Sequence, residues 1–279
     1  MPETGDHSLP SIWFDPDFDQ ENIPDYDLTV LASRDALVFV ILRLGKIEGI
    51  VRLADLSRAV QAGDPEALHR KLIKSGLPEG MFHQLDLYLR DDQYSLIPEV
   101  LIRDNDPRDI LSLRFLLPAN ETAEKFVRDE LACVFIGRPA LSDALQERCR
   151  KFSLRSYGIL VAQEAIRLSA GKKDIMLADL GNRSLDIALA SAGELKFCNA
   201  FTIRTAEDAA YHLLNVYRQQ QASPFVYLTG NLVHDSRITN LVLPYLKDHS
   251  FLTIDSGLKL SDEIPGGEAD LITLLNQLR

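Results

Sequence analysis

The six residues Asp179-Leu180-Gly181-Asn182-Arg183-Ser184 bring a carboxylate, a glycine and a hydroxyl into one short turn. Backbone N–H groups exposed in such a turn can receive the anionic oxygens of a phosphate. The alternative is the tight turn of a hairpin between two buried strands, because glycine and asparagine both tolerate positive φ. The first interpretation predicts an ATP-handling enzyme, and the second a folded scaffold.

Other catalytic motifs are absent from the sequence. It contains no G-x-x-x-x-G-K-[ST] loop, no G-x-G-x-x-G after a strand and no G-x-S-x-G elbow. The six histidines lack H-x-x-x-H or H-E-x-x-H spacing, and the three cysteines lack the paired spacing of a zinc site. Neighbours in sequence rarely face each other, which argues against a His234-Asp235 dyad. We therefore predict no catalytic residues and no metal ligands from these motifs.

The bulk composition is that of a globular protein. The chain has 279 residues, of which 46% are hydrophobic and 25% charged. No run approaches the roughly 18 to 20 apolar residues that cross a bilayer, and the N-terminus lacks the basic start and apolar run of a secretory signal. Cys133, Cys149 and Cys198 are too few and too scattered for a disulfide framework, which suits a reducing compartment. We expect a cytoplasmic protein without membrane insertion.

The charge is concentrated at the N-terminus. Residues 1–30 contain eight acidic residues and no Lys or Arg, out of a net charge of −11 for the whole chain. No Lys/Arg cluster of useful length follows, so we expect no binding of nucleic acid. Residues 1–26 are predicted to form a solvated acidic arm. The aromatic residues Trp13, Phe14, Phe18 and Tyr26 leave a docking segment as the alternative.

The first half of the chain predicts a meander of strands followed by mixed elements. Strands are expected at 28–33, 37–44 and 47–54, a helix from Asp64-Pro65, and a hairpin of 85–90 with 93–97 turning on Asp91-Asp92. Pro98-Glu99 is predicted to end that strand and begin a short helix. A buried strand at 132–137, a helix at 142–148, a strand at 151–156 and an apolar helix at 157–170 follow.

The second half repeats this order from Lys172. Three strands are expected up to Ile203, then a helix from Thr205, a strand ending at Gly230, a helix at 238–246, a strand, and a closing helix after Gly266-Gly267. Thr205 with Asp208 resembles a capping box. His212 lies on this helix, where we expect a surface or satisfied histidine. We predict a duplicated βββαβαβ α/β fold, with an arm at 1–26, one lobe at 27–172 and a second at 173–279.

This duplicated pattern resembles the actin-like ATPase fold of actin, sugar kinases and Hsp70. More narrowly, the chain is similar to a bacterial domain-of-unknown-function family assigned that fold. The residues that carry the similarity are Tyr94-Ser-Leu-Ile-Pro98-Glu99, Gly193-Glu-Leu-x-x-x-Asn199-Ala-Phe201 with Thr205-x-Glu207-Asp208, and Leu228-Thr229-Gly230. The family implies a fold but no established activity.

The wider fold implies ATP between two lobes, with one phosphate-binding hairpin from each lobe and an acid near Mg²⁺. The second hairpin has suitable residue types in Asp179, Gly181 and Ser184. The first hairpin, Leu31-Ala32-Ser33-Arg34-Asp35-Ala36, has no glycine and a bulky arginine. Asp35 becomes a metal ligand only if the alignment slips by several residues, and Arg34-Asp35 is expected to be a solvated turn.

Two functional hypotheses follow. The leading one is a catalytically inactive actin-like protein, a pseudo-ATPase, that needs no cofactor and acts as a scaffold or adaptor for an unknown protein partner, with a homodimer among the alternatives. The other is an ATP-binding or weakly ATP-hydrolysing protein that uses Mg²⁺ in the interlobe cleft. Its candidate nucleotide-binding residues are Asp179, Gly181, Asn182, Ser184, Thr229 and Gly230.

Overall fold

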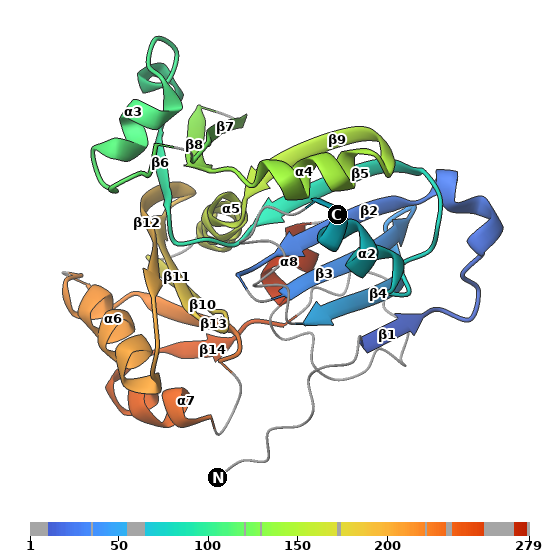
Figure 1. Ribbon diagram of the computed structural model, residues 1–279. Helices are drawn as coiled ribbons and strands as arrows, with labels where there is room; N and C mark the ends of the chain where they lie inside the picture. The colour runs from blue at the N-terminus through green and yellow to red at the C-terminus, as the bar shows by residue number, and fades with distance from the viewer. Residues whose placement is uncertain are drawn as a thin grey trace.

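The computed structural model describes most of the chain. The described residues are 11–34, 36–54, 65–119, 121–128, 130–171, 174–220, 222–232, 236–253 and 271–277. Two large sheets and a smaller one organise this part of the protein (Figure 1).

The two large sheets have the same strand order and directions once the extra edge strand β1 is set aside. The first sheet has the order β1-β4-β3-β2-β5-β9, with β1 (Ser11–Phe14), β2 (Asp27–Ala32), β3 (Ala36–Arg43), β4 (Lys46–Ala54), β5 (Phe82–Leu89) and β9 (Cys149–Ser156). The second has the order β12-β11-β10-β13-β14, with β10 (Ile175–Leu180), β11 (Ser184–Ser191), β12 (Glu194–Thr202), β13 (Phe225–Gly230) and β14 (His249–Phe251). In each, an antiparallel meander is extended by two parallel strands. The predicted duplicated α/β fold is confirmed.

The two meanders match in the lengths of their strands and in the positions of their turns and register shifts. Their three strands have 6, 8 and 9 residues in both halves. Both close with a two-residue turn of positive φ, Leu44-Gly45 in the first and Ala192-Gly193 in the second. Such turns match the twist of the flanking strands, and glycine adopts positive φ without a steric penalty. Register shifts also lie at matching places, after Ile41 and after Leu189.

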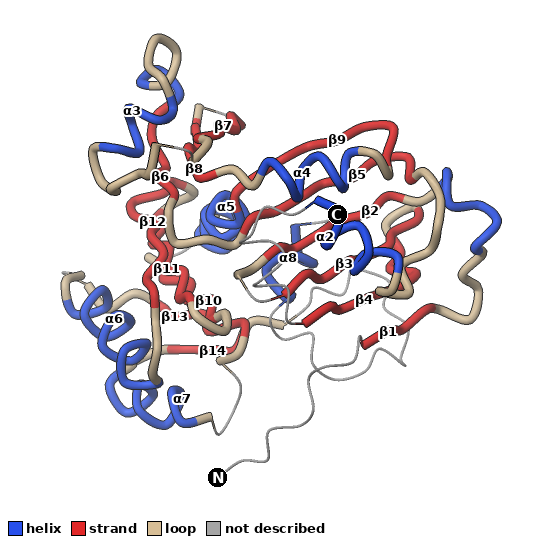
Figure 2. Tube along the Cα trace, in the orientation of Figure 1, coloured by secondary structure: helices blue, strands red, loops and turns tan. Residues whose placement is uncertain are grey.

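Helices cover the sheets and fill the space between them (Figure 2). α5 (Tyr157–Ser169) and α8 (Ile272–Gln277) share one apolar core with residues of both large sheets. α2 (Pro65–Ile73) and α4 (Pro139–Gln146) pack into the core of the first sheet, whereas α6 (Ala206–Arg218) and α7 (Arg237–Val242) lie against the second. Short 3₁₀ helices lie at η1 (Gln20–Asp25), η2 (Glu99–Leu101) and η3 (Leu243–Tyr245). Within the described ranges, no helix is both long and apolar enough to cross a membrane.

Two local predictions about helix ends are confirmed. The Thr205 hydroxyl accepts a hydrogen bond from the Asp208 backbone at 3.1 Å, and the Asp208 carboxylate accepts one from the Thr205 N–H, which completes the capping box of α6. Pro98 ends a strand, and Glu99 begins η2. Both helix ends are determined by residues close to each other in the sequence, so a local pattern was enough to predict them.

The predicted hairpin at 85–90 and 93–97 is wrong. β5 is hydrogen-bonded on both sides, to β2 and to β9, so neither edge is free for the next strand. β6 (Tyr94–Pro98) instead pairs with β8 (Leu131–Ile136), whose other neighbour is β7 (Ala123–Arg128). With α3 (Pro107–Ser112) this third sheet forms a small module that protrudes from the large sheets (Figure 1).

The expectation of a solvated arm is wrong for residues 11–26. β1 pairs antiparallel with β4. The ring of Phe14 stacks on Phe18 at 4.8 Å between centroids, Phe18 contacts Tyr26, and Tyr26 is fully buried. Gly49 leaves room for this packing, because a Cβ there would lie 2.6 Å from the Phe14 ring. The acidic composition predicted a solvated segment. The aromatic side chains pack this segment onto the protein instead, because their burial removes a large apolar area from water.

Candidate functional site

The two turns that correspond to phosphate-binding hairpins face each other between the lobes. Both are closed in the same way, by Ser33 N–H to Ala36 O at 2.9 Å and by Gly181 N–H to Ser184 O at 2.8 Å. Because the meanders match in length, Leu31 occupies the strand position that Asp179 has in the second lobe. Ser33 likewise corresponds to Gly181. The first turn therefore lacks both the acid and the glycine. Asp35, considered above as a metal ligand, lies outside the described residues.

Two carboxylates lie side by side in the second lobe. Asp179 of β10 is paired with Asp186 of β11 across the antiparallel ladder, so both side chains project from the same face of the sheet. Both side chains are 1% exposed. Two buried acids on neighbouring positions of adjacent strands need a compensating charge or a proton.

Arg90 of the first lobe supplies that charge. It directly follows β5, and its Nη2 donates to Asp179 Oδ1 at 2.6 Å, to Asp179 O at 3.1 Å and to Asp186 Oδ2 at 3.3 Å. Its Nε donates to the Ser184 hydroxyl at 3.3 Å. A Cβ added to Gly181 would lie 2.9 Å from Arg90 Nε, so the glycine makes room for the guanidinium. The Asp-x-Gly-x-x-Ser turn thus holds an arginine side chain of the same protein.

Two tyrosines complete the buried network. The Tyr157 hydroxyl donates to Asp179 Oδ2 at 2.8 Å, and the guanidinium of Arg90 lies over the Tyr157 ring at 4.5 Å. The Tyr94 hydroxyl donates to Asp186 Oδ1 at 3.4 Å and contacts Cys198 Sγ at 3.5 Å. Each carboxylate therefore receives a hydrogen bond from the arginine and one from a tyrosine. The network joins β5, β6 and α5 to the second sheet.

The buried environment shifts the ionisation of these groups. Burial, opposed by Arg90 and reinforced by Asp179, raises the pKa of Asp186 to about 7. Burial lowers the pKa of Arg90, but the neighbouring Asp179 carboxylate outweighs this effect and raises it well above its ordinary value. Burial, followed by the charge of Asp179, raises the pKa of Tyr157 far above its ordinary value. Arg90 is thus a permanent cation, whereas Asp186 titrates near neutral pH.

The remaining candidate residues lie at the same end of the second sheet. Thr229 of β13 is in register with Asp179, is 2% exposed, and its hydroxyl has no hydrogen-bond partner among the described residues. Gly230 has a φ of +73°, and a Cβ there would lie 2.2 Å from the Leu180 carbonyl oxygen. Asn182 is exposed and accepts a hydrogen bond from Asn231 Nδ2 at 3.1 Å. The structure therefore brings all six candidates together, and close packing against the Leu180 backbone and the Asp179 side chain accounts for Gly230.

The first hairpin is held by its own ion pairs. Arg34 Nη2 lies 2.5 Å from Asp92 Oδ1 and 3.2 Å from Asp91 Oδ1. Arg138 pairs with Asp91 at 3.1 Å and donates to Ser33 O at 2.8 Å. Burial raises the pKa of Asp91, but its hydrogen bond with Asp92 and the guanidinium groups of Arg138 and Arg34 outweigh burial and lower it to about 2. The expectation of a purely solvated Arg34 is wrong, because the acids that follow β5 reach it.

The space left between the two turns is small. The cavity has a volume of about 30 Å³. It is lined by Ser33, Arg34, Arg90, Asp91, Asp92, Asn182, Arg183 and Ser184. A water molecule needs about 10–15 Å³ of such volume, whereas small-molecule sites are typically about 300–1,000 Å³. The residues in this arrangement do not fit Mg²⁺-ATP.

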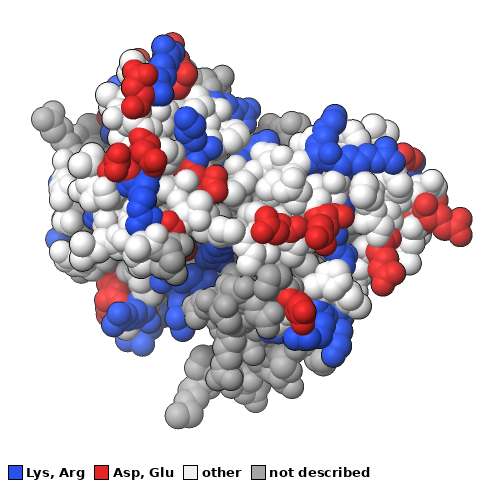
Figure 3. All heavy atoms as spheres, turned by 45° about the horizontal axis from the view of Figure 1, so that its top comes forward, with Lys and Arg blue, Asp and Glu red and all other residues white. Residues whose placement is uncertain are grey.

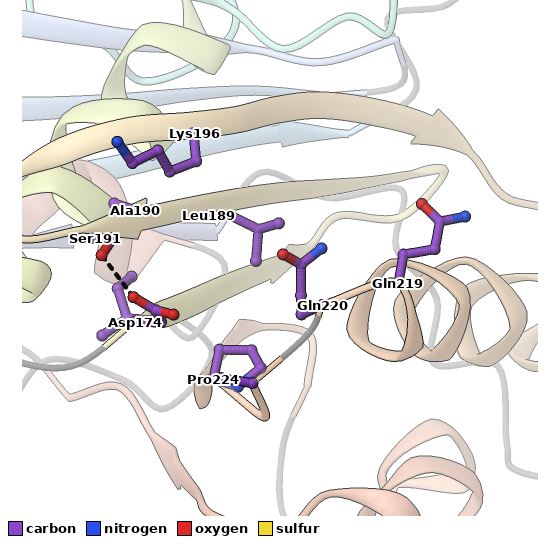
Figure 4. A pocket seen from close by; sticks show the side chains of 10 residues that line it. Asp174, Leu189, Ala190, Ser191, Lys196, Gln219, Gln220 and Pro224 are labelled. Atoms are coloured by element: carbon purple, nitrogen blue, oxygen red, sulfur yellow. Dashed lines mark hydrogen bonds between the residues drawn. The ribbon is translucent and has the colours of Figure 1, made fainter.

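A larger open hollow of about 470 Å³ lies at the opposite end of the second sheet (Figure 4). It begins at Ile175, roughly 20 Å along β10 from Gly181 at about 3.3 Å per residue. Asp174 accepts a hydrogen bond from Ser191 at 2.5 Å, and Lys196 is paired with Glu194 at 2.6 Å. In Figure 4 the side chains of Lys196 and Gln219 point away from each other. The polar groups do not converge on one ligand position.

Other groups singled out in the sequence have structural partners. His212 stacks on Phe201 at 4.5 Å, as expected for a satisfied histidine. Burial raises the pKa values of all three cysteine thiols. No group of three or more metal-ligating side chains occurs in the described ranges. His234-Asp235 and Gly266-Gly267 lie outside those ranges.

Comparison with known families and structures agrees with this architecture. Residues 15–248 match the family "Protein of unknown function (DUF3822)". The chain belongs to this DUF3822 family. No curated protein matches it.

Solved structures show the fold. A Bacteroides thetaiotaomicron protein with actin-like ATPase fold and unknown function is 18% identical, with 92% of this chain and 98% of that chain covered at a TM-score of 0.75. The PilM–PilN type IV pilus biogenesis complex is similar at 11% identity, 90% and 97% coverage and a TM-score of 0.62. The ethanolamine utilization protein EutJ from Carboxydothermus hydrogenoformans follows at 12% identity, 91% and 89% coverage and a TM-score of 0.50. The DUF3822 protein is thus an actin-like-fold protein, as the resemblance implied.

Sequence reasoning missed Arg90. In the sequence it is an arginine at the end of a strand before Asp91-Asp92, a pattern typical of a solvated turn. The available signal was the position itself, since the residue after β5 lies at the carboxyl end of a parallel strand, where ligand sites of open sheets form.

Proposed function

We propose that this DUF3822 protein is a catalytically inactive actin-like protein that acts through protein contacts as a scaffold or adaptor. The observation that carries the proposal is the guanidinium of Arg90, 2.6 Å from Asp179 and held against Gly181. In an ATP-binding relative of this fold, a metal ion and phosphate oxygens belong between the two hairpins. Here a side chain provides the positive charge permanently.

The energetics favour keeping Arg90 in place. Removing one member of a buried ion pair leaves an uncompensated charge and destabilises a protein by about 3–5 kcal/mol. Mg²⁺-ATP would have to displace the arginine from two acids, a tyrosine ring and a serine. Among the described residues of the first hairpin, Leu31 and Ser33 stand where an acid and a glycine belong, so neither position repeats the groups of the second turn.

Two observations support a role in binding other proteins. A structurally similar chain occurs in the PilM–PilN complex of type IV pilus biogenesis, although the likeness establishes the fold alone. The small module also exposes apolar side chains, with Leu113 at 85% and Leu116 at 99% exposure. We place the protein in the bacterial cytoplasm, where its cysteines stay reduced, and a homodimer is one form of such contact.

The alternative, ATP binding or weak hydrolysis in the interlobe cleft, is favoured by the Asp179-x-Gly181-x-x-Ser184 turn itself. Thermal unfolding with and without 5 mM Mg²⁺-ATP distinguishes the two. A ligand at 100 times its Kd stabilises by about 2.7 kcal/mol, which raises the Tm of a chain of this size by several degrees. We expect no rise for the wild type.

A matched pair of variants identifies the cause. Arg90→Ala removes the guanidinium from the second turn, and Arg34→Ala removes the exposed arginine of the first hairpin. Titration with a fluorescent ATP analogue measures binding directly, so differences in stability between the variants do not affect it. Saturable wild-type binding that Asp179→Asn abolishes would overturn the proposal. Binding gained only in Arg90→Ala would show that the arginine excludes the nucleotide.

A further inference from the structure

A groove runs between α2 and α4 on the outer side of the first sheet. Two adjoining hollows of about 420 and 300 Å³ share the lining residues His69, Ala144 and Glu147, so they form one continuous groove. The groove lies on two helices that pack against the first sheet (Figure 1), and none of its lining residues lines the cavity between the two hairpin turns. It is therefore independent of the buried Arg90 network.

Two apolar side chains, Ala144 and Ile73, line this groove. Ala144, 8% exposed, lies at the floor, where its small side chain leaves space above it. Ile73, at the end of α2, is 50% exposed beside it. Both helices direct other apolar residues into the sheet core, so Ile73 is not needed there. A hollow between two helices with apolar side chains at its base is a surface that a third helix can fill.

The rims of the groove are mostly acidic. Asp143 and Glu147 stand four residues apart on the α4 side, are exposed, and form no ion pair with described residues. On the α2 side Glu66 pairs with Arg70 at 3.8 Å, and the charge of Glu79 acts on Arg148. The two uncompensated carboxylates give the groove a negative potential. Basic and acidic side chains are interspersed on the face shown in Figure 3.

We propose that this groove binds a basic amphipathic helix of a partner protein. One apolar side chain of that helix fills the space over Ala144 and against Ile73, and Lys or Arg residues four apart pair with Asp143 and Glu147. The eight residues of α4 span about 12 Å, so two to three helical turns suffice. The inference rests on the proposed role in protein contacts and gives that role a surface and a partner chemistry.

The test uses a synthetic 14-residue Leu/Lys amphipathic helix, fluorescently labelled, with a Leu/Glu helix of the same pattern as its control. Anisotropy titration against the full chain in 0.15 M salt is expected to show saturable binding of the Lys helix only. The double variant Asp143→Lys/Glu147→Lys should raise the Kd at least tenfold, and Ile73→Ser at least threefold. Binding should weaken at 0.5 M salt, where the Debye length shrinks.

The matched control is Asp104→Lys/Asp109→Lys in the small module, which makes the same change of net charge on exposed acids elsewhere. We expect its Kd to stay within twofold of the wild type. Equal weakening in both double variants, binding of the Leu/Glu helix, or no binding of the Lys helix at 1 mM would each overturn the groove. None of these outcomes depends on Mg²⁺-ATP, so failure of the groove and failure of the scaffold proposal remain distinguishable.

Discussion

The β2–β3 turn and the β10–β11 turn have the same length and the same closing hydrogen bond, yet they hold charge in opposite ways. The first keeps Arg34, 41% exposed, paired with two acids of its own lobe. The second buries two acids and receives its cation from the other lobe through Arg90, 4% exposed. The two halves thus share the backbone geometry of the turn, whereas only the second turn has a buried cluster of charged side chains. We therefore expect the contact of Arg90 with Asp179 and Asp186 to contribute more to the free energy of unfolding than the ion pairs of Arg34.

The largest contrast is expected between the two arginines. Arg90→Met leaves Asp179 and Asp186 buried without their cation, so we expect a loss of about 3–5 kcal/mol in the free energy of unfolding. Arg34→Met removes a half-exposed ion pair and should lose about 1 kcal/mol or less. Urea denaturation at pH 7.5 measures both. Equal losses would mean that the second turn is no more dependent on its arginine than the first.

A pH dependence should follow Asp186. Its pKa is about 7 in the folded protein and 3.8 ordinarily, so between these values the folded state holds a proton that the unfolded chain releases. This contribution to stability is complete below pH 3.8 and is lost as pH rises to about 7. Asp186→Asn lacks it, so its stability relative to wild type should improve by about 2 kcal/mol from pH 5 to pH 7.

Asp91→Asn is the control in the first turn. The pKa of Asp91 is lowered to about 2, so its contribution is present above pH 3.8 and is lost only as pH falls toward 2. The difference between Asp91→Asn and wild type should therefore stay constant from pH 5 to pH 7. A slope in this control and none in Asp186→Asn would contradict the assignment of charges.

Making the second turn resemble the first should have a smaller effect. Gly181→Ser places a Cβ about 3 Å from Arg90 and Ser184, so the guanidinium must shift. We expect a loss of about 1–3 kcal/mol, the range for overpacking a well-filled site. In Arg90→Ala, the same substitution should cost less, which a double-mutant cycle measures. Additive losses would show that the glycine does not serve the arginine.

The smallest effects should be equal in the two halves. Gly45→Ala and Gly193→Ala each force a residue with a Cβ into positive φ, with no atom within 4 Å of that Cβ. Each should lower the stability by about 1 kcal/mol. Chemical denaturation of the two variants tests this symmetry. A large difference would mean that the matched hairpins are not energetically equivalent.

The sequence predicts most of the fold from signals that extend over a few residues. The meanders, the capping box of α6 and the Pro98-Glu99 boundary depend on alternation, turn residues and local hydrogen bonds. The errors concern partners. The 85–97 hairpin is wrong because β5 is enclosed by two parallel neighbours, and the solvated arm is wrong because Phe14, Phe18 and Tyr26 pack together.

For the site, the sequence by itself determined the Asp179-x-Gly181-x-x-Ser184 turn and the absence of its counterpart at residues 31–36. Only the tertiary structure decided what the turn holds. Arg90 lies 89 residues from Asp179 and 96 from Asp186, and no local pattern connects them. Whether a charged side chain is solvated or buried against its partner depends on burial, and the assembly of the two lobes creates that burial.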